Sequence, residues 1–158
     1  MEKRNFLGKM AISEVRNLIV KNPTVIKLND SMDELLKKVN EDLKTCHVYV
    51  VDDNHKLIGS VRMNSIVQYL FPMAAVLSSG VTSTTKLNIN LFSVKVADLM
   101  KQDPFSVKES TSLSEMAIIM IKEQINELPV VNDDMTLIGQ VNVYEIIEAY
   151  KTINAAIA

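Results

Sequence analysis

"LPVVNDDMTLIGQVNVYEIIEAY", residues 128–150, joins two short apolar runs, an acidic turn and the start of a helix. An earlier stretch, "VYVVDDNHKLIGSV" at residues 48–61, has the same order, and its VV and LIG motifs recur in the later one. Two apolar runs on either side of an Asp- and Asn-rich turn indicate two adjacent strands. The chain therefore carries the same supersecondary unit twice.

A second pair of matching stretches precedes these strands. "VRNLIVKNPTVIKLNDSMDELL" from Val15 aligns with "VADLMKQDPFSVKESTSLSEMA" from Val96. A short strand is expected after the proline of each, at 24–28 and at 105–108. The capping-box patterns Ser31-x-x-Glu34 and Ser112-x-x-Glu115 then predict that a helix begins in each half.

Apolar residues recur at helical spacing after each cap and are expected to bury one helix face. They are Leu35, Leu36, Val39 and Leu43 in the first half, and Leu113, Met116, Ala117, Met120 and Ile121 in the second. A further helix is expected at 64–70 and at 143–152. A β-α-β-β-α unit of about 55 residues is marginal alone, but two copies can cover each other's sheets. The expected fold is α/β, with two such repeats packed as a pseudo-twofold pair and clefts where they meet.

The repeats divide the chain into three parts. Residues 1–70 would hold an N-terminal helical lead-in and the first repeat, residues 71–95 a linker, and residues 96–158 the second repeat. The lead-in has apolar positions Phe6, Leu7, Met10 and Ile12. The linker centre, Ser78 to Thr85, is rich in Ser, Thr and Gly, which indicates a flexible connection. A lid over a cleft is the alternative interpretation of this segment.

The composition restricts the class of protein. Of 158 residues, 47% are hydrophobic and 23% charged, which is typical of a globular chain. The net charge is −2 and the basic residues are dispersed, so no nucleic-acid partner is expected. The most apolar run, 69–77, is far shorter than the ~20 residues of a spanning helix, so no membrane partner is expected either. The single Cys46 fits a reducing compartment, and the predicted location is the cytoplasm.

No catalytic or metal-binding set is apparent. Cys46 and His47 are adjacent, and neighbours in a strand point to opposite faces, so they could not form a nucleophile–base dyad. Two His and one Cys at this spacing make no transition-metal site. The acidic turns lack the ligand pattern of a calcium loop. We therefore expect no enzyme, no metal and no required cofactor.

The two halves, "NPTVIKLND…VYVVDDNHKLIGSVRMNSI" and "DPFSVKESTS…NELPVVNDDMTLIGQVNVYEI", resemble the CBS domain, the cystathionine-β-synthase-type repeat. The pair would be a Bateman module, and the resemblance covers Val15 to Tyr150 except the linker. It implies a stand-alone regulatory module that binds AMP, ADP, ATP or S-adenosylmethionine in the cleft between the repeats. It also implies signalling by conformational change, a homodimer and an effector protein as partner.

The resemblance also implies which residues touch the ligand. In the family, a Thr or Ser three residues after the glycine contacts phosphate, and an Asp three residues later holds the ribose. The second repeat places Asn142 and Glu145 at these positions. The first repeat places Arg62 and Ser65 there, so the ribose carboxylate is missing while a guanidinium is available for phosphate. The adenine would be flanked by Thr24, Val25, His47, Val48, Phe105, Ser106, Glu127, Leu128 and Pro129.

Other interpretations of these residues stay open. Asn142-x-x-Glu145 is also a capping box, which needs no ligand, although one helix end can serve both purposes. Leu128 can be ordinary strand core, and Phe105 can plug the interface between the repeats. The main alternative function is a ligand-free dimerisation or scaffold module with degenerate sites. An enzyme is the second alternative.

Overall fold

The computed structural model describes residues 7–15, 17–78 and 94–157. The strands are β1 (Val25–Lys27), β2 (His47–Val51), β3 (Leu57–Arg62), β4 (Lys101–Gln102), β5 (Glu127–Val131) and β6 (Leu137–Asn142). The helices are the 3-10 turn η1 (Ile12–Glu14), α2 (Met32–Glu41), α3 (Met63–Leu70), α4 (Pro72–Ser78), α5 (Val96–Leu99), α6 (Leu113–Glu123) and α7 (Val143–Ile157).

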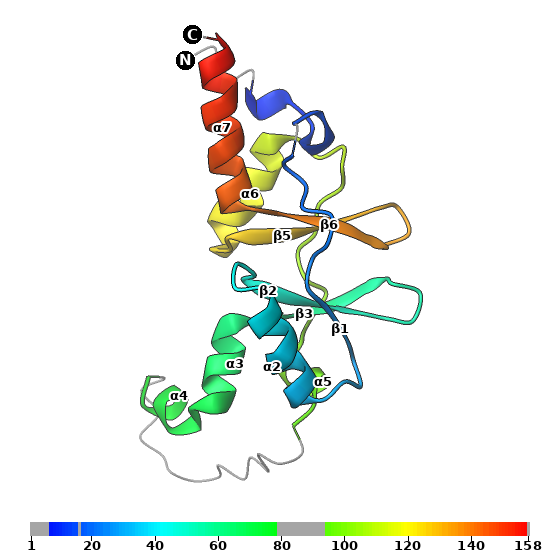
Figure 1. The fold of residues 1–158 in the computed structure, drawn as a ribbon, viewed down its shortest axis with the longest axis vertical. Coiled ribbons are helices and arrows are strands. Elements are labelled where there is room, and N and C mark those ends of the chain that lie inside the picture. The colour runs from blue at the N-terminus through cyan, green and yellow to red at the C-terminus, as the bar shows by residue number, and fades with distance from the viewer. Residues whose placement is uncertain (1–6, 16, 79–93, 158) are drawn as a thin grey trace.

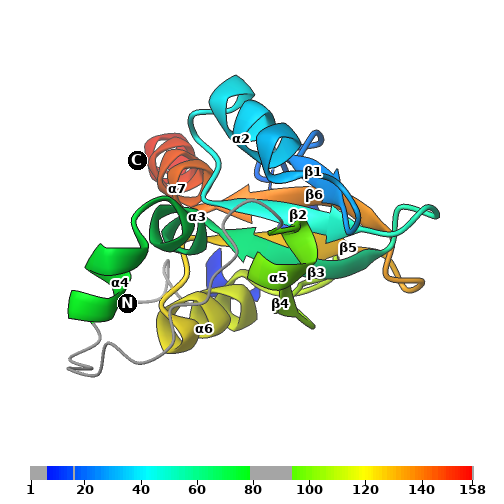
Figure 2. The ribbon, with the colours of Figure 1, turned by 90° about the horizontal axis from the view of Figure 1, so that it is seen from below.

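Two sheets lie face to face, and helices cover their outer sides. The first sheet has the order β1-β2-β3-β4, and the second consists of β5 and β6. Helices α2 and α3 lie outside the first sheet, and α6 and α7 lie outside the second (Figure 1). The view from below shows the strands of the two sheets stacked over one another (Figure 2). The predicted α/β fold with two packed repeats is confirmed.

The two hairpins are built alike. Val48 pairs with Val61 in the first hairpin, and Leu128 pairs with Val141 in the second. Each hairpin has a register shift just before its turn, after Val50 in the first and after Val130 in the second. The predicted turns form because an Asp52 or Asn132 side-chain oxygen accepts two backbone N–H groups of its own turn. Both sequence motifs therefore encode the same local structure.

The hairpin tips hold one end of the two sheets together. The Leu57 N–H donates to the Met135 carbonyl at 2.9 Å, and the Leu137 N–H donates to the His55 carbonyl at 3.1 Å. A shared apolar cluster lies behind these bonds, made of Tyr49, Val51, Leu57, Val131 and Leu137. The space between the repeats is therefore dry and closed at the tips, and its polar part lies at the opposite ends of the strands.

Each repeat receives an edge segment from the other. The segment before the first repeat reaches the second sheet, where Val20 and Gln140 exchange backbone hydrogen bonds of 2.8 and 2.9 Å. Likewise β4, just before the second repeat's predicted strand, pairs with Gly59 and Ser60 of β3. We call these two segments, residues 17–20 and 101–102, the crossing segments. They tie the repeats together through backbone bonds.

The strand predicted at 105–108 is wrong. Only Val107 bonds to the second sheet there, through Pro129 and Val131, as an isolated parallel bridge. The corresponding prediction at 24–28 is confirmed by β1. Phe105 instead contacts the crossing segment 101–102, because the Lys101 ammonium lies over its ring.

Both predicted helix caps form and position α2 and α6. The Ser31 and Ser112 side chains accept the N–H groups of Glu34 and Glu115, and the glutamates return a bond to the serine N–H. Leu35 and Met116 are buried as predicted, but Leu43 is 87% exposed and Ile121 is 76% exposed. Leu43 lies beyond the end of α2 at Glu41, and Ile121 lies one residue past the buried Met120, which turns it toward solvent.

Replacing Ser112 by alanine is expected to lower the free energy of unfolding by about 1 kcal/mol, because the first turn of α6 loses a hydrogen-bond acceptor. Urea unfolding followed by circular dichroism measures the change. Ser110→Ala, an exposed serine two residues earlier, is the control and should have little effect. Equal losses in the two variants would contradict a role for the cap.

The lead-in and the linker are only partly as predicted. Residues 7–9 form a helical turn and η1 follows, but the chain from Val15 to Val20 is not a continuous helix. Helix α4 occupies residues 72–78, within the predicted linker, and Pro72 suits the first position of a helix. Phe6 and residues 79–93, with most of the expected flexible connection and the possible lid, lie outside the described residues.

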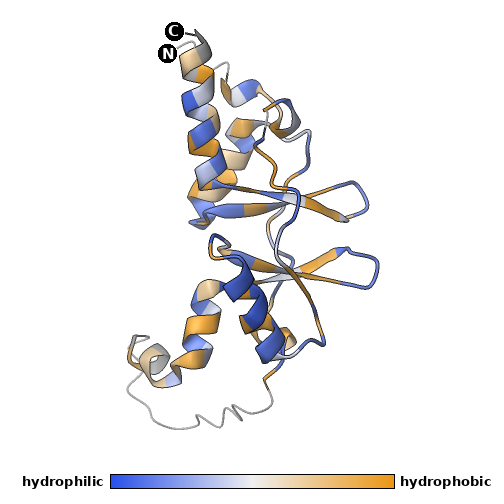
Figure 3. Cartoon of the chain, in the orientation of Figure 1, coloured by the Kyte–Doolittle hydropathy of each residue, from blue (hydrophilic) through white to orange (hydrophobic). Residues whose placement is uncertain are grey.

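Hydropathy differs between the outer helices. Helix α2 is largely hydrophilic, whereas α3 and α4 carry more hydrophobic residues (Figure 3). Exposed large apolar side chains there are Val67, Leu70, Phe71, Met73 and Leu77. In the part of the chain that the structure describes, no helix has the length and apolar character needed to cross a bilayer.

Candidate functional site

Buried polar side chains gather between the two sheets. In the described residues they are Thr45, His47, Ser60, Glu127, Gln140 and Asn142. All belong to the four inner strands β2, β3, β5 and β6, or directly precede them. Burying a polar group is unfavourable unless it is hydrogen-bonded, so such a concentration in the interior calls for a specific reason.

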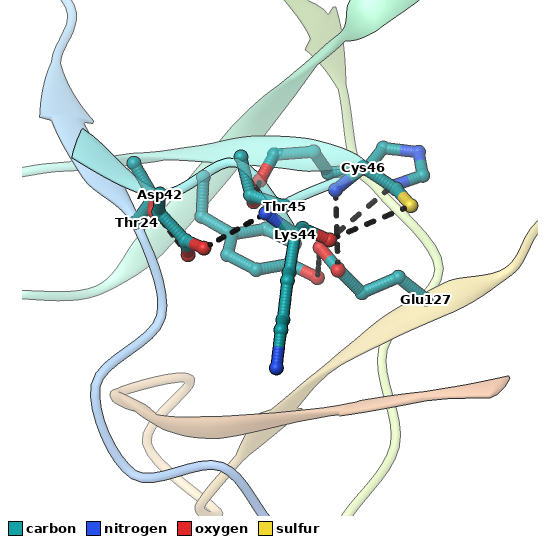
Figure 4. A network of polar contacts seen from close by, with 8 residues as sticks. Thr24, Asp42, Lys44, Thr45, Cys46 and Glu127 are labelled. Carbon is teal, nitrogen blue, oxygen red and sulfur yellow. Dashed lines mark hydrogen bonds and ion pairs between the residues drawn. The ribbon is translucent and has the colours of Figure 1, made fainter. Parts of the chain in front are cut away.

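Glu127, at the start of β5, lies at the centre of this group. Its side chain has no exposed surface. Oε1 accepts the Tyr49 O–H at 3.0 Å, and Oε2 accepts the Cys46 N–H at 3.3 Å (Figure 4). Burial raises the pKa of Glu127 to about 7, although the hydrogen bonds from Cys46 and Tyr49 act in the opposite direction. Burial also raises the pKa of Tyr49, which keeps its phenol protonated as a donor.

His47, at the start of β2, occupies the matching place in the first repeat. In the first hairpin His47 pairs with Arg62, and in the second hairpin Glu127 pairs with Asn142 in the same way. Burial, followed by the nearby Arg62 charge, lowers the pKa of His47 to about 4. Its Nδ1 lies 3.9 Å from Glu127 Oε1 and has no hydrogen-bond partner. Near neutral pH the imidazole is therefore uncharged, and the pair is not an ion pair.

A small cavity opens beside these groups. Its lining brings together five residues predicted to flank the ligand, His47, Arg62, Phe105, Glu127 and Pro129. Its volume is about 20 Å³. That is room for roughly one water molecule, so a nucleoside enters only if the repeats or their side chains move apart. We call this space the first cleft.

The cations of the first cleft come from two elements. Arg62 takes the N-cap position of α3 without making a side-chain cap bond, so its guanidinium is not used to cap the helix. Lys101, in a crossing segment, places its ammonium 5.1 Å from the centre of the Phe105 ring. Phe105 remains 40% exposed, so it only partly plugs the interface.

Asn142 and Glu145 separate into two roles. Asn142 Oδ1 accepts the N–H groups of Tyr144 at 2.9 Å and Glu145 at 3.2 Å, which makes Asn142 the cap of α7. One carboxylate oxygen of Glu145, Oε2, is buried and accepts no hydrogen bond. The Glu145 side chain instead lines a cavity of about 770 Å³ together with Glu14 and Glu148.

The remaining predicted residues are placed in different surroundings. Thr24 donates its hydroxyl hydrogen to Asp42 Oδ2 at 3.0 Å, near the Glu127 network (Figure 4). Val25 packs on the apolar cluster at the hairpin tips. Leu128 is fully buried in the core of the second repeat, so it has only backbone groups to offer a ligand. Ser106 is half-buried and does not line the first cleft.

Sequence reasoning missed Tyr49, Ser60 and Lys101, which also line the first cleft. Pro129 was predicted to flank the ligand, and Tyr49 holds the equivalent position in the first repeat. A comparison of the repeats could therefore have found Tyr49. Ser60 and Lys101 meet through the pairing of β3 with β4, which has no sequence signal in two residues. In the described part of the chain, no group of three or more His, Cys, Asp or Glu is placed to hold a metal ion.

The sequence model of the CBS domain family matches the chain twice, at residues 15–72 and 96–152. The chain belongs to the CBS-domain family. Among its relatives, this CBS pair is 29% identical over 130 residues to the CBS domain-containing protein CBSX2, chloroplastic, of Arabidopsis thaliana. The match covers 75% of this chain and 54% of the relative, so the chain spans about half of that protein.

Solved structures of CBS proteins have the same fold. The crystal structure of CBSX2 in complex with AMP has a TM-score of 0.69 at 25% identity, and the match covers 91% of this CBS pair and 98% of that chain. A CBS domain-containing protein from Thermotoga maritima has a TM-score of 0.69 at 28% identity, covering 89% and 94% of the two chains.

Proposed function

We propose that this CBS pair binds an adenine nucleotide or an adenosyl ligand between its repeats and transmits occupancy as a change of shape. The observation that carries the proposal is the set of buried polar groups between the sheets, in which His47 Nδ1 and Gln140 Oε1 lack hydrogen-bond partners. Buried polar atoms without partners are rare, and a polar ligand would satisfy them. The complex of the relative CBSX2 with AMP supports the class of ligand.

The change of shape follows from the size of the first cleft. Because it holds about 20 Å³, ligand entry requires a more open arrangement of the repeats. The bonds from Tyr49 and Cys46 to Glu127 join the two repeats, so these bonds rearrange on opening. The ligand shifts the population toward the open arrangement by no more than its difference in affinity for the two states. The role is regulatory rather than catalytic, and an effector protein reads the arrangement.

Each repeat offers ligand contacts, and these line two different cavities. Glu145 offers a carboxylate oxygen that no hydrogen bond engages, which can accept a ribose hydroxyl. Asn142 holds the start of α7 in place for Glu145. In the first repeat, the Arg62 guanidinium binds phosphate.

Calorimetric titration with AMP, ADP, ATP and S-adenosylmethionine tests this function. We expect one dominant site per chain, and Glu145→Ala should weaken binding by about tenfold or more, because the ribose loses a charge-assisted bond. Glu41→Ala, an exposed carboxylate at the end of α2, is the control. The absence of heat with every ligand would favour the scaffold function. Binding lost only in Arg62→Ala would place the site in the first repeat.

The proposal extends to assembly and location. A homodimer is supported by exposed apolar side chains on α6 and α7, including Ile118, Ile121 and Ile147. These helices also border an apolar groove of about 340 Å³. The single Cys46 supports a reducing compartment such as the cytoplasm.

A further inference from the structure

Glu127 is a buried carboxylate with a function still unaccounted for. It lies between the repeats and accepts hydrogen bonds from the opposite repeat, from the Tyr49 hydroxyl and the Cys46 backbone, and the His47 backbone N–H also favours its charged form. In the described residues, its one contact within ion-pair distance is the uncharged His47 at 3.9 Å. A buried charge without an opposite charge beside it is unfavourable, so a proton on Glu127 is the natural compensation.

The charged and titratable groups around Glu127 come from β2 and the residues before it, from β3 and from β4. They are Asp42 before β2, Cys46, His47 and Tyr49 of β2 and its approach, Arg62 at the end of β3, and Lys101 of β4. Tyr49 stays a neutral donor, and Asp42 adds negative charge. Arg62 and Lys101 line the same small cavity as Glu127 and are its nearby cations.

We propose that the first cleft binds the phosphate-bearing end of its ligand together with one proton, which Glu127 takes up from solvent. This proposal rests on the proposed function and adds the charge of the ligand and its coupling to pH. A phosphate held by Arg62 and Lys101 would lie in the same small cavity as Glu127. It also brings negative charge next to Glu127, and repulsion between the two anions favours the protonated form.

The hydrogen bonds of the cleft accommodate this proton. A protonated carboxyl keeps one oxygen to accept the Tyr49 O–H or the Cys46 N–H. Its new O–H has an acceptor available in His47 Nδ1, which is buried without a partner 3.9 Å from Oε1 and needs only a small approach. Because burial already brings the pKa of Glu127 to about 7, the proton is gained near neutral pH.

Proton uptake can be counted by calorimetry. AMP would be titrated into the full chain in two buffers of different ionisation enthalpy, and the difference in heat gives the number of protons taken up. The titration is done at pH 8, because the phosphate monoester is already fully ionised there and does not itself change its protonation. We expect up to about one proton per AMP in the wild type and none in Glu127→Gln. Glu41→Gln is the matched control and should behave as the wild type. Adenosine, which lacks the phosphate, should take up no proton.

Three other outcomes would separately contradict the role of Glu127, the coupling to phosphate and the proposed function. Equal proton uptake in the wild type and Glu127→Gln overturns the role of Glu127 while the proposed function stands. Equal uptake with adenosine and AMP overturns the coupling to phosphate. No binding of AMP, adenosine or the other ligands overturns the proposed function, and this inference with it.

A second variant keeps the test independent of Glu127→Gln. Tyr49→Phe removes a donor to the ionised carboxylate, so the carboxyl should hold its proton to higher pH. In the wild type, AMP affinity should increase as pH falls from 9 to 7, by up to about tenfold per unit. Tyr49→Phe should shift this dependence to higher pH, and a shift to lower pH would overturn the assignment.

Discussion

Replacement of Gly139 by alanine is expected to lower the free energy of unfolding by about 3 kcal/mol, the upper part of the usual range for overpacking. A Cβ at this position would lie 2.5 Å from the Ile19 side chain and 2.7 Å from the Val20 carbonyl oxygen. The Val20 backbone cannot retreat without breaking its two hydrogen bonds to Gln140. The substitution therefore separates a crossing segment from the second sheet.

Gly59 supplies the matched control because it holds the same place in the first repeat. A Cβ there would meet mainly the Cγ and Sδ atoms of the Met100 side chain, which is flexible and can move aside, although the Lys101 carbonyl oxygen lies 3.0 Å away. We expect Gly59→Ala to cost about 1 kcal/mol. Chemical denaturation of both variants measures the difference. The Gly→Ala change has the same effect on the unfolded chain at both sites, so a difference between the two variants reports on the folded state. Equal losses of stability in Gly59→Ala and Gly139→Ala would contradict the role given to the contact with Val20.

Glu127 and His47 are expected to give opposite pH dependences of stability. The pKa of Glu127 is raised to about 7 in the folded protein, so its contribution is present below pH 4.5 and is lost as pH rises through 7. The pKa of His47 is lowered to about 4, so its contribution is present above pH 6.5 and is lost as pH falls through 4. Each shift corresponds to at most about 3 kcal/mol.

Two variants separate these contributions. Relative to the wild type, Glu127→Gln should gain stability as pH rises from 4.5 to 7, and His47→Gln should gain stability as pH falls from 6.5 to 4. Urea unfolding at several pH values in this interval measures both trends. If His47 and Glu127 instead formed a charged pair, both variants would lose stability against the wild type near pH 6.

The repeated elements could be predicted because their signals are local. Ser31 and Ser112 each lie three residues before the glutamate that completes the cap, and the turns at Asp52 and Asn132 close over a few residues. Such patterns need no knowledge of the rest of the chain. The strand predicted at 105–108 is wrong, because only Val107 bonds to the second sheet there.

The candidate site was only partly predictable. The resemblance of the repeats to the CBS domain indicated that Arg62, His47 and Glu127 contact the ligand. The structure brings these three residues to one cavity. The contact between Tyr49 and Glu127 joins residues 78 positions apart, and no periodicity encodes it. The closed state of the cleft and the shifted pKa values arise from burial, which is a property of the packed chain.

The crossing segments have a consequence for folding. Val20 bonds to the second sheet and residues 101–102 pair with the first, so each sheet is bonded to backbone that comes from the other repeat. A half produced alone would leave a strand edge without its partner, and exposed edges promote association with other chains. We therefore expect the two halves to unfold as a single cooperative unit, and a homodimer of one repeat that exchanged these edges would have the same architecture.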